Sequence, residues 1–280
     1  MTPPSLAARS IKRAVLTAVG AGSFWHLGVR NSLAVSGREH LENLPDSKVL
    51  FVANHQTWFL DVIAIYHALT RPHASPLAGV RAPIHVSFIA ANETMNRRGL
   101  LPKFFAAGGA VCIKRTWRDG DQDVSRPVEK DDLTNIATAL NEGWVFTFPQ
   151  GTTKIGAPGR RGTAHLICAQ KPVVVPVVLS GFRDAFDKSG LVVRNPGTKL
   201  SVRFDAPLAI DHAAGIDRVL AQVMDAIGES PAEPLDATAP AKQAAQPAGE
   251  DAGQAVLKHS AGTDNMFSAN GNPPQAADPR

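Results

Sequence analysis

Short apolar runs alternate along the chain with stretches in which apolar residues recur at helical spacing. The runs typical of strands span residues 49–53, 84–90, 108–115, 144–148, 173–179 and 200–204. The stretches of helical spacing span residues 62–69, 133–140, 163–170 and 216–227. Strands that alternate with helices predict an α/β domain with a mostly parallel central sheet flanked by helices.

The first 35 residues have a different pattern. At helical spacing Ile11 and Val15 share one side, while Arg9 and Arg13 lie nearly opposite. Glycines interrupt the segment and it is too polar to predict a transmembrane helix. We expect an N-terminal amphipathic helix over residues 1–35 that rests in a membrane interface. A helix packed on the domain is the alternative.

The C-terminal end differs again in composition. From residue 230 to residue 280 the chain is rich in Ala, Pro, Gln, Gly and Asp and has few bulky apolar residues. Such a segment buries too little apolar surface to offset its ordering entropy. We therefore expect a disordered tail over 230–280 and a folded domain over 36–229.

Composition narrows the classes of partner. The formal net charge of +4 and the pI near 9.2 are mildly basic and suit an anionic partner. No strand or helix interleaves aromatic and basic residues, which disfavours a nucleic-acid partner. Cys112 and Cys168 each lie in an apolar run and are interpreted as core residues rather than a disulfide pair. No cysteine and histidine cluster has zinc spacing, so no metal site is predicted.

The most informative polar block follows the first predicted strand. Residues 54–61 contain His55 and Asp61, and they lead directly into a predicted helix. Imidazole titrates near neutral pH, and a nearby carboxylate can fix its tautomer and stabilise its protonated form. The two residues are therefore candidates for a general base and the acid that orients it.

Three further segments place distinctive residues at the ends of predicted strands. They are Lys114 with Arg115, residues 149–153, and the turn after Leu179. In a parallel sheet the loops at the carboxyl ends of strands gather in one crevice. We expect these segments to meet the block at 54–61 there.

Taken in order, the four blocks resemble the PlsC-like glycerophospholipid acyltransferases, a family that includes lysophosphatidate acyltransferase. The matching positions are His55 and Asp61; Gly109, Ile113 and Arg115; Phe148, Pro149, Gln150, Gly151 and Thr152; and Val175, Pro176 and Val177. Each block alone has little specificity, but all four in order over residues 40–185 are specific.

The resemblance implies an enzyme at the cytoplasmic face of the cell membrane, peripheral or monotopic. It would move a fatty acyl chain from acyl-CoA or acyl-carrier protein to the free hydroxyl of a lysophospholipid, most simply 1-acyl-sn-glycerol-3-phosphate, to give phosphatidate. His55 would take the proton of the hydroxyl, and Asp61 would orient His55. The alcohol is itself the nucleophile, so no acyl-enzyme and no cofactor beyond the acyl donor are implied.

The resemblance also implies a binding site for the acceptor headgroup. Arg115 would bind a phosphate, because a guanidinium makes paired charge-assisted hydrogen bonds to phosphate oxygens. Gly151 and Thr152 would form the turn near the headgroup and offer backbone N–H groups to an anion. Gln150 and Lys154 would complete this site.

Two departures from the family pattern bear on these expectations. His55 and Asp61 are one residue further apart than is usual, so the two must bracket a turn that enters the helix. Gln150 stands where the family has glutamate, and Thr153 where arginine is common. Gln150 can serve if the role is to bind the acceptor or to hold the turn, and Lys154 could replace the missing arginine as a point charge.

These departures keep two alternatives open. One is acylation of another lyso-lipid, such as a lyso-ornithine lipid or a lysophospholipid with a larger headgroup. The other is a catalytically impaired homologue that binds membranes.

Overall fold

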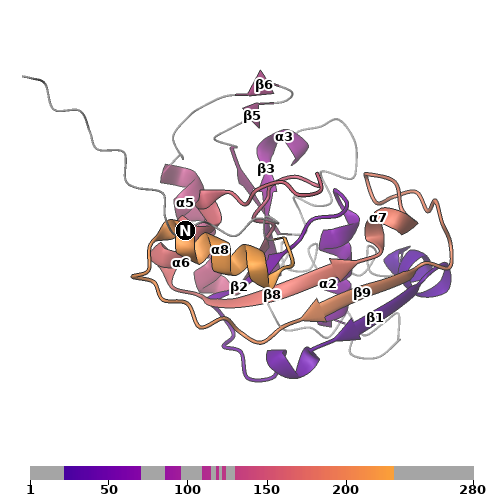
Figure 1. Ribbon diagram of the computed structural model, residues 1–280, viewed down its shortest axis with the longest axis horizontal. Coiled ribbons are helices and arrows are strands. Elements are labelled where there is room, and N and C mark those ends of the chain that lie inside the picture. The colour runs from indigo at the N-terminus through magenta and orange to yellow at the C-terminus, as the bar shows by residue number, and fades with distance from the viewer. Residues whose placement is uncertain are drawn as a thin grey trace, which may run out of the picture. The chain divides into compact units, whose positions relative to one another are not determined.

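Seven strands form one sheet in the computed structural model of the protein (Figure 1). The structure describes residues 22–70, 86–95, 109–114, 118–119, 122–123 and 130–229. Across the sheet the strands follow the order β1-β9-β8-β2-β7-β3-β4. Their bounds are β1 Ser32–Ser36, β2 Val49–Ala53, β3 Val86–Ala91, β4 Ala110–Ile113, β7 Trp144–Thr147, β8 Val173–Ser180 and β9 Lys199–Phe204. β8, β2, β7, β3 and β4 pair in parallel, and β9 runs antiparallel to β8.

The central strand β2 is buried on both faces. Val49, Phe51 and Ala53 belong to one hydrophobic core, and Leu50 and Val52 belong to a second core on the opposite face. Successive side chains of a strand point to opposite faces, so an unbroken apolar run is what a strand covered on both sides requires. The loop after β2 is thereby anchored at the middle of the sheet.

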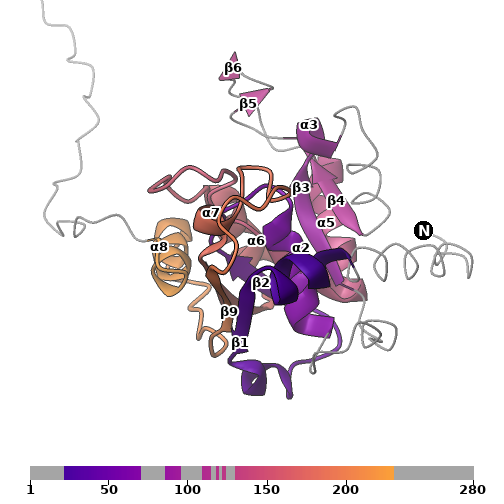
Figure 2. The ribbon, with the colours of Figure 1, turned by 90° about the vertical axis from the view of Figure 1, so that its right-hand side faces the viewer.

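Helices cover the two faces unequally. Helix α2 (Leu60–Thr70) packs into the core that contains Phe51. Helices α5 (Lys130–Glu142), α6 (Arg161–Gln170) and α8 (Ile216–Ala226) pack into the core that contains Leu50. Of these, α6 and α8 pack against each other (Figure 1), and α5 lies along β4 and β7 (Figure 2).

Several short elements complete the described part of the chain. They are the π-helical turn η1 (Trp25–Val29), the 3-10 turn η2 (Arg38–Leu41), α3 (Asn92–Met95), α7 (Phe182–Ala185) and the antiparallel pair β5 (Arg118–Asp119) and β6 (Gln122–Asp123). Of these, α7 follows β8 directly and contributes to the site described below.

Pro176 lies inside β8, a position that proline rarely takes in a paired strand. Its carbonyl accepts the N–H of Asp205 at 3.0 Å, on the side of β9. The N–H and C=O of one strand residue point to the same side, and pairing with β9 begins only at Val177. The N–H that proline lacks would therefore point toward β9, and the hydrogen bonds between β8 and β2 do not need it.

The predicted mostly parallel sheet flanked by helices is confirmed. The predicted N-terminal segment needs a correction at its end, because residues 32–36 form β1 instead of a helix and pair with β9. The rest of that segment up to residue 21, and the tail from residue 230, lie outside the described residues. No helix in the described ranges combines the length and the apolar character needed to span a membrane.

Both cysteines are free thiols and half-buried. In the described part of the chain, no group of three or more His, Cys, Asp and Glu side chains is placed to hold a metal ion.

Candidate active site

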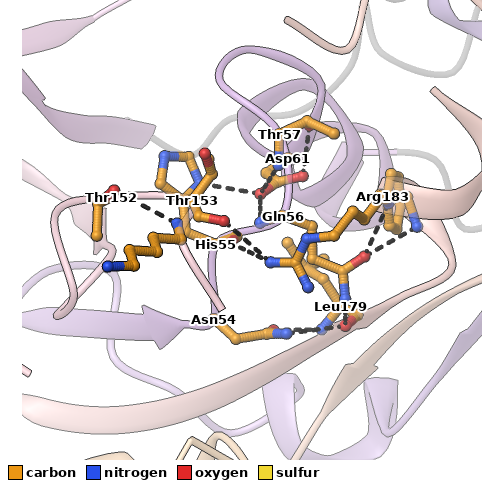
Figure 3. A network of polar contacts seen from close by, with 11 residues as sticks. Asn54, His55, Gln56, Thr57, Asp61, Thr152, Thr153, Leu179 and Arg183 are labelled. Atoms are coloured by element: carbon orange, nitrogen blue, oxygen red, sulfur yellow. Dashed lines mark hydrogen bonds and ion pairs between the residues drawn. The ribbon is translucent and has the colours of Figure 1, made fainter. Parts of the chain in front are cut away.

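His55 and Asp61 meet in the loop that joins β2 to α2 (Figure 3). His55 Nδ1 lies 2.9 Å from Asp61 Oδ2. An ionised carboxylate can only accept a hydrogen bond, so such a contact needs the proton on Nδ1, and in the neutral imidazole Nε2 then carries the lone pair. That tautomer is the one a general base needs, with Nε2 free to take a proton from a substrate.

The extra residue between His55 and Asp61 does not separate them. On a regular helix a six-residue offset would turn the two side chains about 240° apart. Here His55 lies in the loop, and α2 begins only at Leu60, so the chain turns back before Asp61. The carboxylate can therefore reach the imidazole across the turn.

Asp61 is fully buried and holds this turn together. Its Oδ2 accepts the backbone N–H groups of Gln56 and Thr57, the latter at 2.9 Å, and its Oδ1 accepts the Thr57 hydroxyl at 2.7 Å. The first turn of α2 also favours a negative charge, because unpaired N–H groups and the helix dipole are positive there. The carboxylate is thus rigidly placed before any substrate arrives.

The imidazole of His55 is supported from a second side. It stacks on Phe148, just past the end of β7, with ring centroids 4.1 Å apart and planes 21° apart. The side chain of His55 is 14% exposed. The ring is therefore held by two elements and retains limited access to solvent.

Two amides tie the same loop to the end of β8. Asn54 donates to the Leu179 carbonyl at 2.9 Å and accepts the Leu179 N–H at 2.7 Å. Gln56 donates to the Leu179 carbonyl at 2.8 Å, and its Oε1 accepts the backbone N–H groups of Phe182 and Arg183 at the start of α7. The predicted convergence of the β2 and β8 ends is therefore present.

Arg183 joins three of the predicted segments. Its Nη2 donates to the His55 carbonyl at 3.3 Å and to the Thr153 carbonyl at 3.1 Å (Figure 3). It comes from α7, which follows β8, and it links the loop after β2 to the turn after β7. Sequence reasoning did not identify Arg183, and only its place just after the predicted strand end at Leu179 pointed to it.

The loop after α7 closes on the start of α2. Trp58 and Phe59 donate their N–H groups to the carbonyls of Lys188 and Ser189 at 3.0 and 3.1 Å. Partial burial opposes the ionisation of Asp187 in this loop. Hydrogen bonds from the Ser189 hydroxyl and from backbone N–H groups outweigh it and lower the pKa of Asp187 from 3.8 to about 2. Asp187 therefore remains ionised and bonded at neutral pH.

Gly190 is a further point of contact between this loop and the block that carries His55. Its φ is +79°, and a Cβ placed on it would lie 2.5 Å from Leu60 Cβ and 3.0 Å from Thr57 Oγ1. We expect Gly190→Ala to displace the start of α2, with costs of roughly 1–2 kcal/mol for the left-handed backbone and about 1–3 kcal/mol for overpacking. Thermal unfolding should show a lowered Tm, and assays of the acyl transfer that the sequence resemblance implies should show a lowered kcat.

Gly197→Ala is the matched control for this prediction. Gly197 has a similar φ of +81°, but nothing lies within 4 Å of its added Cβ. The loss of stability in Gly197→Ala therefore measures the cost of backbone strain alone. Equal losses in the two variants would contradict a specific contact between Gly190 and the start of α2.

The turn after β7 contains the other predicted binding residues. Gly151 has a φ of +63° and donates its N–H to the Phe148 carbonyl at 2.9 Å, which closes the turn. Thr152 Oγ1 accepts the N–H of Lys154 at 3.3 Å, and the Lys154 side chain is exposed. Lys154 is thus a cation available at the edge of the site.

Gln150 is only 1% exposed. Its Nε2 donates to the Ala157 carbonyl and to Glu229 Oε2, both at 3.0 Å. Of the two roles considered for Gln150, these contacts favour holding the turn over binding the acceptor.

Arg115 lies outside the described residues. The preceding Lys114 is exposed, and its N–H donates to Asp132 Oδ2 at 2.8 Å. β4, which ends at Ile113, is three strand positions from β2, a span of roughly 14 Å at the usual strand spacing. A ligand held from both strands would have to extend across the sheet.

A comparison with models of known protein families gave a match. A family model described as acyltransferase matches residues 33–180 of the 280-residue chain. A solved structure similar to this chain is the 1-acyl-sn-glycerophosphate (LPA) acyltransferase PlsC from Thermotoga maritima, with 17% identity, a TM-score of 0.49, and coverage of 82% of this chain and 83% of that one. A comparison with curated proteins gave no match.

The matched span contains the His55–Asp61 pair, the turn after β7 and all of β8, and it covers more than half of the chain. The chain therefore belongs to the acyltransferase family.

Proposed function

We propose that the protein transfers a fatty acyl chain from acyl-CoA or acyl-carrier protein to the free hydroxyl of a lysophospholipid. The acceptor proposed first is 1-acyl-sn-glycerol-3-phosphate, which would give phosphatidate. The observation that carries the proposal is the 2.9 Å contact between His55 and a buried Asp61, in a chain of the acyltransferase family.

The reaction follows from the tautomer of His55. The acceptor hydroxyl attacks the thioester carbonyl while Nε2 takes its proton, and Asp61 stabilises the imidazolium that forms. The carbon–sulfur bond then breaks, and the imidazolium returns the proton to the leaving thiolate. The products are an ester and a free thiol, and His55 regains its starting state.

The headgroup of the acceptor would be recognised by charge. Lys154 is exposed beside the turn formed by Gly151 and Thr152, and the proposed phosphate ligand Arg115 follows β4 closely in sequence. A bare phosphate carries more negative charge than a phosphodiester or an amino-acid headgroup, so it gains most from a guanidinium and an ammonium. This supports a phosphate monoester as the acceptor headgroup.

The proposed location is the cytoplasmic face of the cell membrane, where a single-chain lipid acceptor would be embedded. In the described part of the N-terminal segment, Trp25 and Val29 are 57% and 53% exposed. Tryptophan side chains favour the membrane–water interface. These exposed side chains support peripheral attachment through this segment.

An acceptor series tests the substrate. The purified protein should acylate lysophosphatidate more efficiently than a lysophospholipid with a larger headgroup or a lyso-ornithine lipid. Arg115→Ala should raise KM for lysophosphatidate by about 10-fold or more, because a hydrogen bond to a charged group contributes about 1.5–3 kcal/mol. It should change KM for the lyso-ornithine lipid little.

Arg203→Ala is the control, since Arg203 is an exposed arginine on β9 paired with Asp205 at 2.8 Å. Preferred use of another acceptor, with no effect of Arg115→Ala, would move the substrate to a lyso-lipid without a phosphate monoester. Acyl transfer itself would then still stand.

A further inference from the structure

The orientation of the Gln150 amide is determined by its partners. Nε2 faces two acceptors, the Ala157 carbonyl and Glu229 Oε2, each at 3.0 Å. A flipped amide would place Oε1 against both acceptors and lose both hydrogen bonds. Both hydrogens of the amide are therefore used, one within the turn after β7 and one to the residue that follows α8.

The same geometry explains why glutamine stands at this position. A glutamate at 150 would place a carboxylate oxygen against the Glu229 carboxylate and the Ala157 carbonyl. Gln150 is buried and Glu229 half-buried, and two carboxylates in contact there cannot both ionise without a cost. Gln150 and Glu229 are therefore chemically matched, with the amide in the turn and the carboxylate just after α8.

Helix α8 is placed to support the turn along several of its residues. A Cβ on Gly159 would lie 2.6 Å from Met224 Sδ and 2.9 Å from Leu220 Cδ1, so the chain passes directly over α8. Further along, Arg161 Nε lies 3.1 Å from Asp217 Oδ1. Glu229 adds a contact at the end of the helix, after Gly228, whose φ of +71° turns the chain.

We propose that Glu229 is a positioning residue for the acyltransferase site and acts through Gln150. Gln150 follows Phe148 by two residues, and Phe148 stacks on His55. Glu229 holds the amide of Gln150, the amide holds the turn against Ala157, and the turn fixes Phe148 beneath the imidazole. This role deepens the proposed function and rests on it.

Other charged residues lie on the elements that meet around this pair. They are Lys154 beside the turn, Arg160, Arg161 and His165 at or on α6, and Asp217, Arg218 and Asp225 on α8. Arg161 and Asp217 are paired with each other and exposed. All of them are the same in every variant proposed below, so only their interactions with the charge at residue 229 differ between the variants.

Two variants test the charge at position 229. Gln150→Glu places two carboxylates in contact, and Gln150→Glu with Glu229→Gln restores an amide opposite a carboxylate. The Ala157 carbonyl loses its amide donor in both variants, so they differ only at residue 229, in its charge and in the amide donor it offers to residue 150. Near pH 8 we expect the double variant to have a Tm higher by about 5 °C or more and a kcat higher by about 10-fold.

The pH dependence has a defined sign. Mutual repulsion raises the pKa of the carboxyl pair in Gln150→Glu, so a shared proton is lost as pH rises. The amount by which the Tm and kcat of Gln150→Glu fall below those of the double variant should therefore be small near pH 5 and grow toward pH 8. The double variant, with one carboxyl group, should show a weaker trend.

Tm and kcat together distinguish failure of the contact, of the positioning role and of the proposed function. Equal Tm values for the two variants at pH 8 would show that residues 150 and 229 are not in contact. Thermal unfolding measures this without any substrate. Unequal Tm values with equal kcat values would overturn the positioning role. An inactive wild-type protein would refute the proposed acyl transfer, and the role of Glu229 in that site would be refuted with it, while the Tm values would still report on the contact.

Discussion

Replacing His55 by alanine is expected to lower kcat for acyl transfer by about 10²–10⁴-fold, the usual contribution of general-base catalysis. Nε2 of His55 is the atom proposed to take the proton of the acceptor hydroxyl. Asp61, the nearest carboxylate, is fully buried and uses both of its oxygens on the loop. It is therefore not available to replace the imidazole, and initial rates at saturating acceptor concentration should show the loss.

The Tm of His55→Ala should change little by comparison. His55 contributes a stacking contact with Phe148 and a hydrogen bond to Asp61, and Asp61 keeps its bonds to Gln56 and Thr57. His165→Ala is the matched control, because His165 is an exposed histidine on α6. If His55→Ala kept kcat within the range of this control, His55 would not be the general base.

Asp61→Asn is expected to produce the second large effect, a fall in kcat of about 10²–10⁴-fold with KM nearly unchanged. The amide oxygen of asparagine can still accept the N–H groups of Gln56 and Thr57, and its NH₂ can donate to the Thr57 hydroxyl. The shape of the loop should therefore persist. What disappears is the negative charge that stabilises the imidazolium as His55 takes the proton.

A comparison of three variants separates charge from structure. Asp61→Ala should lower the Tm strongly as well as kcat, since each buried N–H or hydroxyl group left unpaired costs about 1–3 kcal/mol. Asp131→Asn, at an exposed carboxylate in the first turn of α5, should leave kcat unchanged and change the Tm little. A loss in Asp61→Asn confined to Tm, with kcat preserved, would show that Asp61 serves only the fold of the loop.

The contact between His55 and Asp61 also bears on the alternative hypothesis that the protein is a catalytically impaired homologue. One of its two supports was the longer spacing in the first block. The turn absorbs the extra residue and brings the two side chains to 2.9 Å. The second support, Gln150, has a structural partner in Glu229. Neither departure therefore argues by itself for a loss of catalysis.

Much of this fold could be predicted from periodicity. The run at β2 is apolar at every position because both faces of the strand are buried. The apolar stripes of α5 and α8 face one core. β1 was missed because its burial alternates with exposure at the sheet edge and it continues from a segment of helical spacing.

The site was predicted less completely, for a physical reason. His55 and Asp61 are close in sequence, and their chemistry is apparent from residue type. Arg183 and Glu229 act on residues about 30 and 79 positions away, and no local pattern marks such a partner. Their roles depend on which strand ends and helix ends the topology brings together.

Phe148 illustrates the same limit. In the sequence it reads as the last residue of an apolar strand, and it matches the third family block. Its ring instead lies past the end of β7 and stacks on His55. Only the order of strands, with β7 beside β2, places the two rings together.

The most direct test of the central claim is product formation by the wild-type protein and by His55→Ala, side by side. Both would receive lysophosphatidate with acyl-CoA or with acylated carrier protein, in liposomes, and mass spectrometry would detect the diacyl lipid. We predict phosphatidate from the wild-type protein and almost none from His55→Ala. If no lyso-lipid acceptor with either donor gave a product that depends on His55, the proposed function would be wrong.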